Sequence, residues 1–167
     1  MGHEYSNTIA IFQNAGESGK FFKTAYGYAV FPTIVKGAFI VGGAHGDGRV
    51  YAKGKYVGNT SMTQATVGLQ IGGAGYSEIV FFQDERAFKE FTSGNFEFGA
   101  GAQAVAVTAA AQAQASTSGS SAGASASNKD AATAGNYYKG MATFTVTKGG
   151  LMAGVSIGGQ KFSYKPV

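Results

Sequence analysis

The spacing of hydrophobic residues changes near residue 27. Before that point Tyr5, Ile9 and Phe12 recur at intervals of four and three, which places them on one face of a helix. After it, hydrophobic and polar residues mostly alternate, which is typical of β-strands. The pattern therefore predicts an N-terminal helix followed by a β-rich region.

A second helical turn follows the first helix, after glycines interrupt the pattern. In this turn Lys20 and Lys23 share one face, whereas Phe21 and Phe22 point away from it. Gly27 suits a C-terminal cap because glycine accepts the left-handed backbone that often ends a helix. We expect the chain to become extended from there on.

The alternating region predicts several strands joined by tight turns. The candidate strands are 28–31, 37–44, 49–55, 65–72, 76–83, 143–147, 151–157 and 160–164. Pro32 should end the first strand, because proline donates no ladder hydrogen bond. Asp47-Gly48 predicts a hairpin turn before the strand at 49–55, since glycine tolerates positive φ. The last two strands should form a closing hairpin.

Three later segments complete the pattern. Asp84 is typical of an N-cap for a short helix that buries Ala87, Phe88 and Phe91. Residues 99–115 favour a long strand through their valines, although their alanines leave a helix open. Residues 116–135 are rich in Ala, Ser and Gly, and we expect them to form a mobile loop within the domain.

Composition is consistent with a single β-rich domain. The 167 residues include 27 Gly and 2 Pro, with 44% hydrophobic and 13% charged residues. This hydrophobic content supports a core, and the glycines suit turns and close strand packing. We therefore predict a mostly β (α+β) fold: an antiparallel barrel-like or sandwich sheet with an N-terminal helix and a short internal helix.

Few residues suggest catalysis or cofactor binding. The chain has no Cys and 2 His, which excludes disulfides and cysteine-ligated metals. His45 and Asp47 form at most a weak metal site, because no third His or Cys completes it. The Gly-x-Gly patterns lie between strands, so they do not match a dinucleotide-binding motif. We expect neither an enzyme nor a cofactor.

Basic residues give the most distinctive charge feature. The formal net charge is +4, which is too low for a dedicated nucleic-acid binder. The strand at 49–55 should place four residues on one face, and with the second helical turn they form our candidate lipid-binding set: Lys20, Phe21, Phe22, Lys23, Arg49, Tyr51, Lys53 and Lys55. The lysines and arginine would contact phosphate head groups and the phenylalanines the membrane interface. The alternative is an ordinary solvated strand face above a core-packed phenylalanine pair.

A series of motifs, in order along the chain, resembles the SYLF domain family. They are GYAVFP at 27–32, KGAF at 36–39, GGAHGDGRV at 42–50, VGLQIG at 67–72, VFF at 80–82 with AF at 87–88, KGGLMAGVS at 148–156 and GQKF at 159–162. The resemblance implies one SYLF-like domain over residues 4–167. It also implies binding of anionic or phosphoinositide lipids, with the segment 5–26 matching the amphipathic helix of eukaryotic members. Some fungal relatives bind and bundle actin, and bacterial relatives are often exported.

We therefore expect a non-enzymatic module that binds anionic phospholipid membranes. The alternative is a bacterial cell-envelope structural or protein-interaction domain, held at the membrane by an N-terminal lipid anchor. The chain resembles the bacterial members, so we expect an exported, periplasmic or outer-membrane-associated protein. Met1, Gly2 and Ser6 fit a myristoylation pattern. We interpret Met-Gly-His instead as a start added to a processed protein whose native signal or anchor is missing.

Overall fold

A computed structural model describes residues 2–36, 43–65, 75–99, 102–107, 139–147 and 155–167. Several expectations lie wholly or mainly outside these residues. They are the strand at 65–72, the loop at 116–135 and most of the strands at 37–44 and 151–157. The C-terminal part of the 99–115 segment also lies outside them.

The helices agree with the sequence pattern in all but their boundaries. Helix α1 spans Gly2–Asn14, α2 spans Gly16–Thr24 and α3 spans Glu85–Phe91. Asp84 caps α3 as predicted, because its carboxylate accepts a hydrogen bond from the Ala87 amide at 3.0 Å. Gly27 is not a helix cap: α2 is capped by Ala25 in extended conformation, and Gly27 is already the first residue of a strand. None of the described helices is long and apolar enough to span a membrane.

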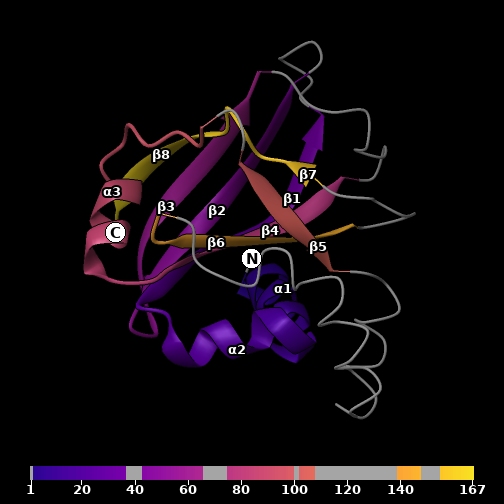
Figure 1. Ribbon diagram of the computed structural model, residues 1–167, viewed down its shortest axis with the longest axis vertical. Helices are drawn as coiled ribbons and strands as arrows, with labels where there is room; N and C mark the ends of the chain where they lie inside the picture. Colours follow the sequence, from indigo (N-terminus) through magenta and orange to yellow (C-terminus); the bar gives the residue numbers. More distant parts are fainter. Residues whose placement is uncertain (1, 37–42, 66–74, 100–101, 108–138, 148–154) are drawn as a thin grey trace.

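A mixed sheet of eight described strands dominates the structure (Figure 1). The strands are β1 (Gly27–Lys36), β2 (Ala44–Ala52), β3 (Lys55–Gln64), β4 (Tyr76–Phe82), β5 (Gln103–Val107), β6 (Met141–Thr147), β7 (Val155–Ser156) and β8 (Lys161–Pro166). Their order is β7-β5-β6-β4-β1-β2-β3-β8, and all pairs are antiparallel except β5–β6. This confirms the predicted sheet-dominated fold with its N-terminal and internal helices, and confirms a strand at 103–107.

The hairpin predicted at Asp47-Gly48 is wrong. Both residues lie inside β2, and the chain turns instead at Lys53 and Gly54, whose φ angles are 52° and 83°. Two positive φ angles are typical of the turn that joins two twisted antiparallel strands directly. Gly48 is required for packing, because a Cβ there would lie 2.6 Å from the Phe31 ring.

Pro32 does not end the first strand. Strand β1 continues to Lys36, and its register shifts between Val30 and Thr33 against β2 and between Phe31 and Ile34 against β4. A proline fits such an irregularity because no ladder hydrogen bond is needed from it. The proline therefore bends the strand without terminating it.

The closing hairpin is also wrong. Strand β7 pairs with β5 and β8 pairs with β3, so the two consecutive strands lie at opposite ends of the strand order. The chain bends between them at Gly159, which has a φ of 85°. In the described residues β7 and β8 do not pair with each other, so the sheet is not closed into a barrel. The architecture is therefore sandwich-like.

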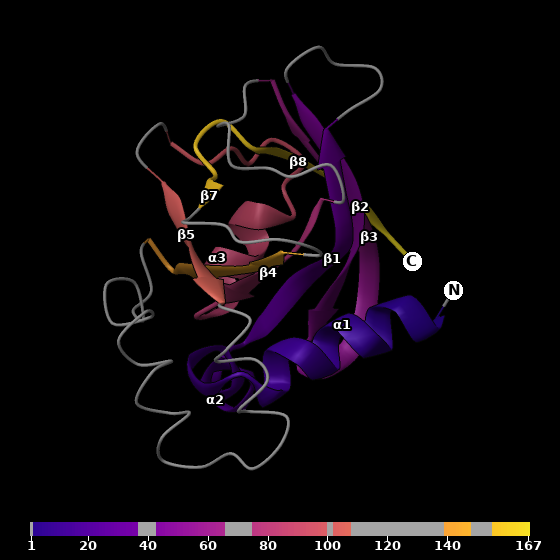
Figure 2. The ribbon, with the colours of Figure 1, turned by 90° about the vertical axis from the view of Figure 1, so that its right-hand side faces the viewer.

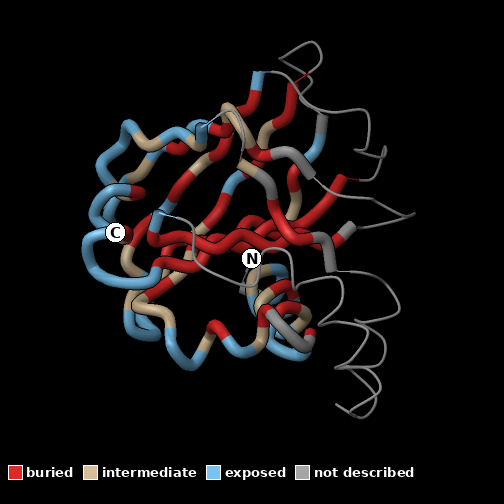
Figure 3. Tube along the Cα trace, in the orientation of Figure 1, coloured by how far each residue is buried: buried red, intermediate tan, exposed pale blue. Residues whose placement is uncertain are grey.

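Both faces of the sheet are covered. Helices α1 and α2 lie side by side on one face (Figure 2). Their Phe12 and Phe21 pack there with Phe81 and Phe144. On the other face, α3 and β8 pack Phe91 and Phe162 in a second core. As a result β4 is buried along its whole length (Figure 3).

Candidate functional site

The hairpin between β2 and β3 and the end of α2 lie at the same end of the molecule. The Lys53 amide donates a hydrogen bond to the Tyr26 carbonyl at 2.9 Å, and the Lys53 ammonium lies 5.5 Å from the Tyr26 ring centroid. Tyr26 follows α2, whose last turn carries Lys23. Lys55 is the first residue of β3. We call Lys23, Lys53 and Lys55 the basic end.

The basic residues do not share one strand face, which corrects the prediction for 49–55. Arg49 and Tyr51 lie on the outer face of β2, but Lys53 is in the turn and Lys55 begins the next strand. The reason is the position of the turn, which falls inside the predicted strand.

Arg49 lies apart from the basic end, under α1. Its guanidinium carbon is 4.3 Å from the ring centroid of Tyr5 and 4.7 Å from that of Tyr56. These cation–π contacts connect α1 to the hairpin. Arg49 is therefore a structural contact between helix and sheet as much as a surface charge.

The aromatic members of the candidate set pack against the sheet. Phe21 is buried, and its ring centroid lies 5.3 Å from those of Phe81 and of Phe144. Phe22 is half-buried and contacts Tyr28 at 5.1 Å. Tyr51 stacks on the same Tyr28 at 5.1 Å. These rings hold α2 in place beside the basic end.

The lysines of the basic end form no ion pair with the carboxylates that the structure describes. Elsewhere, Arg86 pairs with Glu90 at 2.9 Å and Lys89 with Glu85 at 3.5 Å. Within the described part of the chain, no carboxylate forms an ion pair with a lysine of the basic end. Lys20, one turn earlier on α2, is also exposed but is not counted in the basic end. This end therefore presents a local excess of positive charge to an anionic ligand.

A buried polar cluster lies inside the sheet, and sequence analysis missed it. The Gln160 side-chain amide donates to Glu78 Oε1 at 3.0 Å, to the Tyr76 hydroxyl at 3.3 Å and to Gln64 Oε1 at 3.4 Å. All four side chains are at most 1% exposed. Thr145, the partner of Glu78 across β4 and β6, is also completely buried. We call these five residues the interior cluster.

Burial changes the protonation of this cluster. Loss of solvation raises the pKa of Glu78 to about 8, and the hydrogen bond from Gln160 opposes part of that rise. Burial and the nearby Glu78 also raise the pKa of Tyr76 well above its ordinary value. Glu78 therefore carries a proton near neutral pH when nothing else compensates its charge.

The sequence contained a signal for this cluster. Glu78 occupies the same alternate positions as Tyr76, Val80 and Phe82, so it stands on an apolar face of its strand. A charged residue on such a face is rarely buried without a reason. Its partner Gln160 is distant in sequence, and only the tertiary structure brings them together.

The weak metal site suggested by His45 and Asp47 is an exposed pair. His45 Nε2 and Asp47 Oδ1 are 3.5 Å apart on the outer face of β2. Among the described residues, no three His, Cys, Asp or Glu side chains gather as metal ligands.

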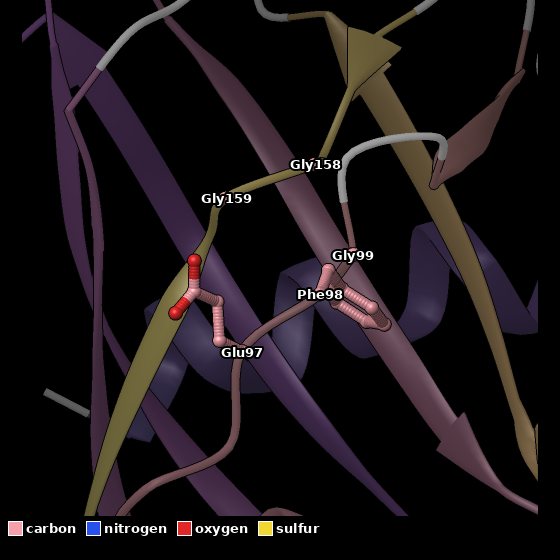
Figure 4. A pocket seen from close by; sticks show the side chains of 5 residues that line it. All are labelled: Glu97, Phe98, Gly99, Gly158 and Gly159. Atoms are coloured by element: carbon pink, nitrogen blue, oxygen red, sulfur yellow. The ribbon is translucent and has the colours of Figure 1, made fainter.

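An open groove of about 390 Å³ adjoins the interior cluster (Figure 4). It is lined by Glu97, Phe98, Gly99, Gly158 and Gly159. The Gln64 side chain donates a hydrogen bond to the Gly158 carbonyl at 3.2 Å. The groove wall therefore contacts the cluster directly.

The chain matches a known protein family. The Ysc84 family, described as Las17-binding protein actin regulator, matches residues 63–165. No curated protein matches the chain. The matched residues include β4, α3, β5, β6, β7 and most of β8, and so both Glu78 and Gln160. Since the match covers more than half of the chain, this protein belongs to the Ysc84 (SYLF) domain family.

Proposed function

We propose that this chain is a non-enzymatic module that binds anionic phospholipid membranes through its basic end. The lysines supply the attraction, and the aromatic residues of α2 supply the rigid support. In keeping with the resemblance to bacterial SYLF proteins, we propose that it acts at an exported, periplasmic or outer-membrane-associated location.

The observation that carries the proposal is the hydrogen bond from the Lys53 amide to the Tyr26 carbonyl. It fixes the hairpin turn next to the end of α2, so that lysines from two separate elements meet. The exposed lysines there have no carboxylate partner among the described residues. Phosphate head groups would supply the negative charges that pair with these lysines.

The expected energy is modest. Each basic residue near an anionic surface contributes about 1 kcal/mol. Three lysines therefore contribute roughly 3 kcal/mol, or about a hundredfold in membrane partitioning. Because the lysines are exposed, this contribution should weaken as salt shortens the Debye length.

The test is co-sedimentation with vesicles of phosphatidylcholine alone and of phosphatidylcholine mixed with phosphatidylglycerol, over a salt series. We expect binding only to the mixed vesicles, decreasing with salt. The variant with Lys23, Lys53 and Lys55 replaced by Gln should lose roughly a hundredfold in partitioning.

A matched control removes the same charge elsewhere. Lys89, Lys161 and Lys165 are exposed on α3 and β8, outside the basic end. Replacing these three by Gln should leave most of the binding intact. Equal loss in both triple variants would show attraction by net charge alone and would reject a site at the basic end.

The family description supports a second candidate, binding to a protein partner. The family is described as Las17-binding protein actin regulator. Co-sedimentation with filamentous actin, using the same two triple variants, tests this candidate. Actin binding without any vesicle binding would favour it over the membrane function.

A further inference from the structure

Three buried oxygen atoms of the interior cluster have no hydrogen-bond partner. They are Glu78 Oε2, Thr145 Oγ1 and Gln160 Oε1. Native proteins leave few such atoms, and each one buried alone costs about 1–3 kcal/mol. All three belong to the interior cluster, which makes this cluster the place in the described structure to look for a bound ligand.

The three atoms belong to side chains that lie next to one another. Glu78 and Thr145 are register partners on β4 and β6, so their Cβ atoms are about 5 Å apart. Gln160 reaches the same point, because its Nε2 lies 3.0 Å from Glu78 Oε1. The three side chains therefore meet in one part of the interior.

We propose that Glu78, Thr145 and Gln160 form a binding site for one small monovalent cation, such as sodium, potassium or ammonium. All three free atoms are oxygens, which suit hard cations and the N–H groups of ammonium. A cation also compensates the buried carboxylate, which otherwise has no charged partner in the described part of the chain.

The charge of the site selects a monovalent ion. One carboxylate balances one positive charge, and among the described residues no three His, Cys, Asp or Glu side chains gather as metal ligands. A divalent ion here would leave an uncompensated charge in the interior, where such charges are strongly unfavourable. Calcium sites by comparison draw six to eight oxygens and typically several carboxylates.

The surrounding residues orient the ligands. The amide nitrogen of Gln160 is engaged by Glu78, Tyr76 and Gln64, so its carbonyl oxygen is directed elsewhere. Gln64 is itself anchored to the Gly158 carbonyl. Such supporting hydrogen bonds hold ligands in place around bound metals.

The groove at Gly158 and Gly159 adjoins the cluster on its solvent side. Its volume of about 390 Å³ is ample for a hydrated ion, and its wall contacts Gln64. Glu97 is exposed there, and Figure 4 shows its carboxylate extending toward the backbone at Gly159. A carboxylate at this position attracts cations to the groove.

The test compares urea unfolding of the intact protein in chlorides of sodium, potassium, ammonium and tetramethylammonium, at constant pH and ionic strength. Tetramethylammonium is too large and donates no hydrogen bonds. We expect at least one small cation to stabilise the fold in a saturable manner, as linkage requires for a ligand of the native state. Sodium NMR linewidths of the wild-type protein measure ion binding directly.

Variants assign the effect to the site. Glu78→Gln and Thr145→Val should each raise the half-saturating cation concentration by about tenfold or more. Glu85→Gln removes an exposed carboxylate of α3 and should leave the half-saturating concentration unchanged.

Identical unfolding in all four salts, with no sodium broadening, would mean that water alone fills the site and would overturn the proposal. So would an undiminished cation response in either site variant. Should Glu78→Gln fail to fold, Thr145→Val and the wild-type sodium NMR still decide.

Discussion

Replacing Glu78 by Gln should remove a large pH dependence of stability. Glu78 is completely buried, and burial raises its pKa in the folded protein from 4.5 to about 8. The residues facing it are Gln64, Thr145 and Gln160, which do not titrate, and Tyr76, whose pKa is raised and which stays neutral. Gln mimics the neutral acid in shape, so the variant separates ionisation from packing.

The sign follows from which state holds the proton. Between pH 4.5 and 8 folded Glu78 keeps its proton, whereas the unfolded chain has lost it. The unfolded state therefore binds fewer protons, and the free energy of unfolding falls by about 1.4 kcal/mol per pH unit as pH rises. From pH 5 to pH 8 the loss is about 4 kcal/mol, a large fraction of the stability of a typical domain.

The assay is urea unfolding of wild type and Glu78→Gln at several pH values between 5 and 8. Tetramethylammonium buffers keep small cations out of the interior cluster. All other ionisable groups are the same in both proteins, so the difference between the two curves isolates Glu78. We expect similar stability at pH 5 and a growing advantage of Glu78→Gln toward pH 8. Parallel curves would refute the raised pKa, and circular dichroism at each pH verifies that both proteins are folded.

Two substitutions test the local structure. Gly48→Ala should destabilise the protein by about 1–3 kcal/mol, because the new Cβ would lie 2.6 Å from the Phe31 ring. Gly99→Ala is its control and should change the urea midpoint little, since a Cβ there meets nothing within 4 Å. Asp84→Ala should cost about 1 kcal/mol in urea unfolding by removing the cap on the Ala87 amide, and Asp84→Asn should largely restore it. An Asp84→Ala protein as stable as wild type would mean that the cap contributes nothing.

The elements that sequence analysis placed correctly depend on neighbours in the chain. The α3 cap at Asp84 and the strands β4 and β6 follow from local patterns, and the structure confirms them. The errors at Asp47-Gly48 and Pro32 have another cause. Glycine and proline suit turns, but each also suits an irregular or closely packed position within a strand. The packing of neighbouring residues determines which of the two occurs. Gly48 is a packing residue because the Phe31 ring lies over it.

The candidate site shows the same division. Their charge makes the lysines recognisable in the sequence, but strand alternation wrongly predicts that those of 49–55 share one strand face. The structure instead brings Lys53 to Tyr26 at the end of α2 through a turn that the pattern did not locate. Phe21 and Phe22 were ambiguous in the sequence because an aromatic side chain next to lysines suits either a core or an interface. The contacts with Phe81 and Tyr28 are tertiary.

Hydrophobic spacing and helix capping act over a few residues. They are therefore enough to predict an N-terminal helical segment, a β-rich domain and a short capped helix from the chain alone. The environment of Glu78, by contrast, depends on tertiary packing. Alternation within one strand assigns residues to two faces, but it does not say that both faces are covered. Helices α1 and α2 cover one face of β4, while β8 and α3 cover the other. That second layer, folded back from the C-terminal part of the chain, encloses the carboxylate of Glu78 with Gln160.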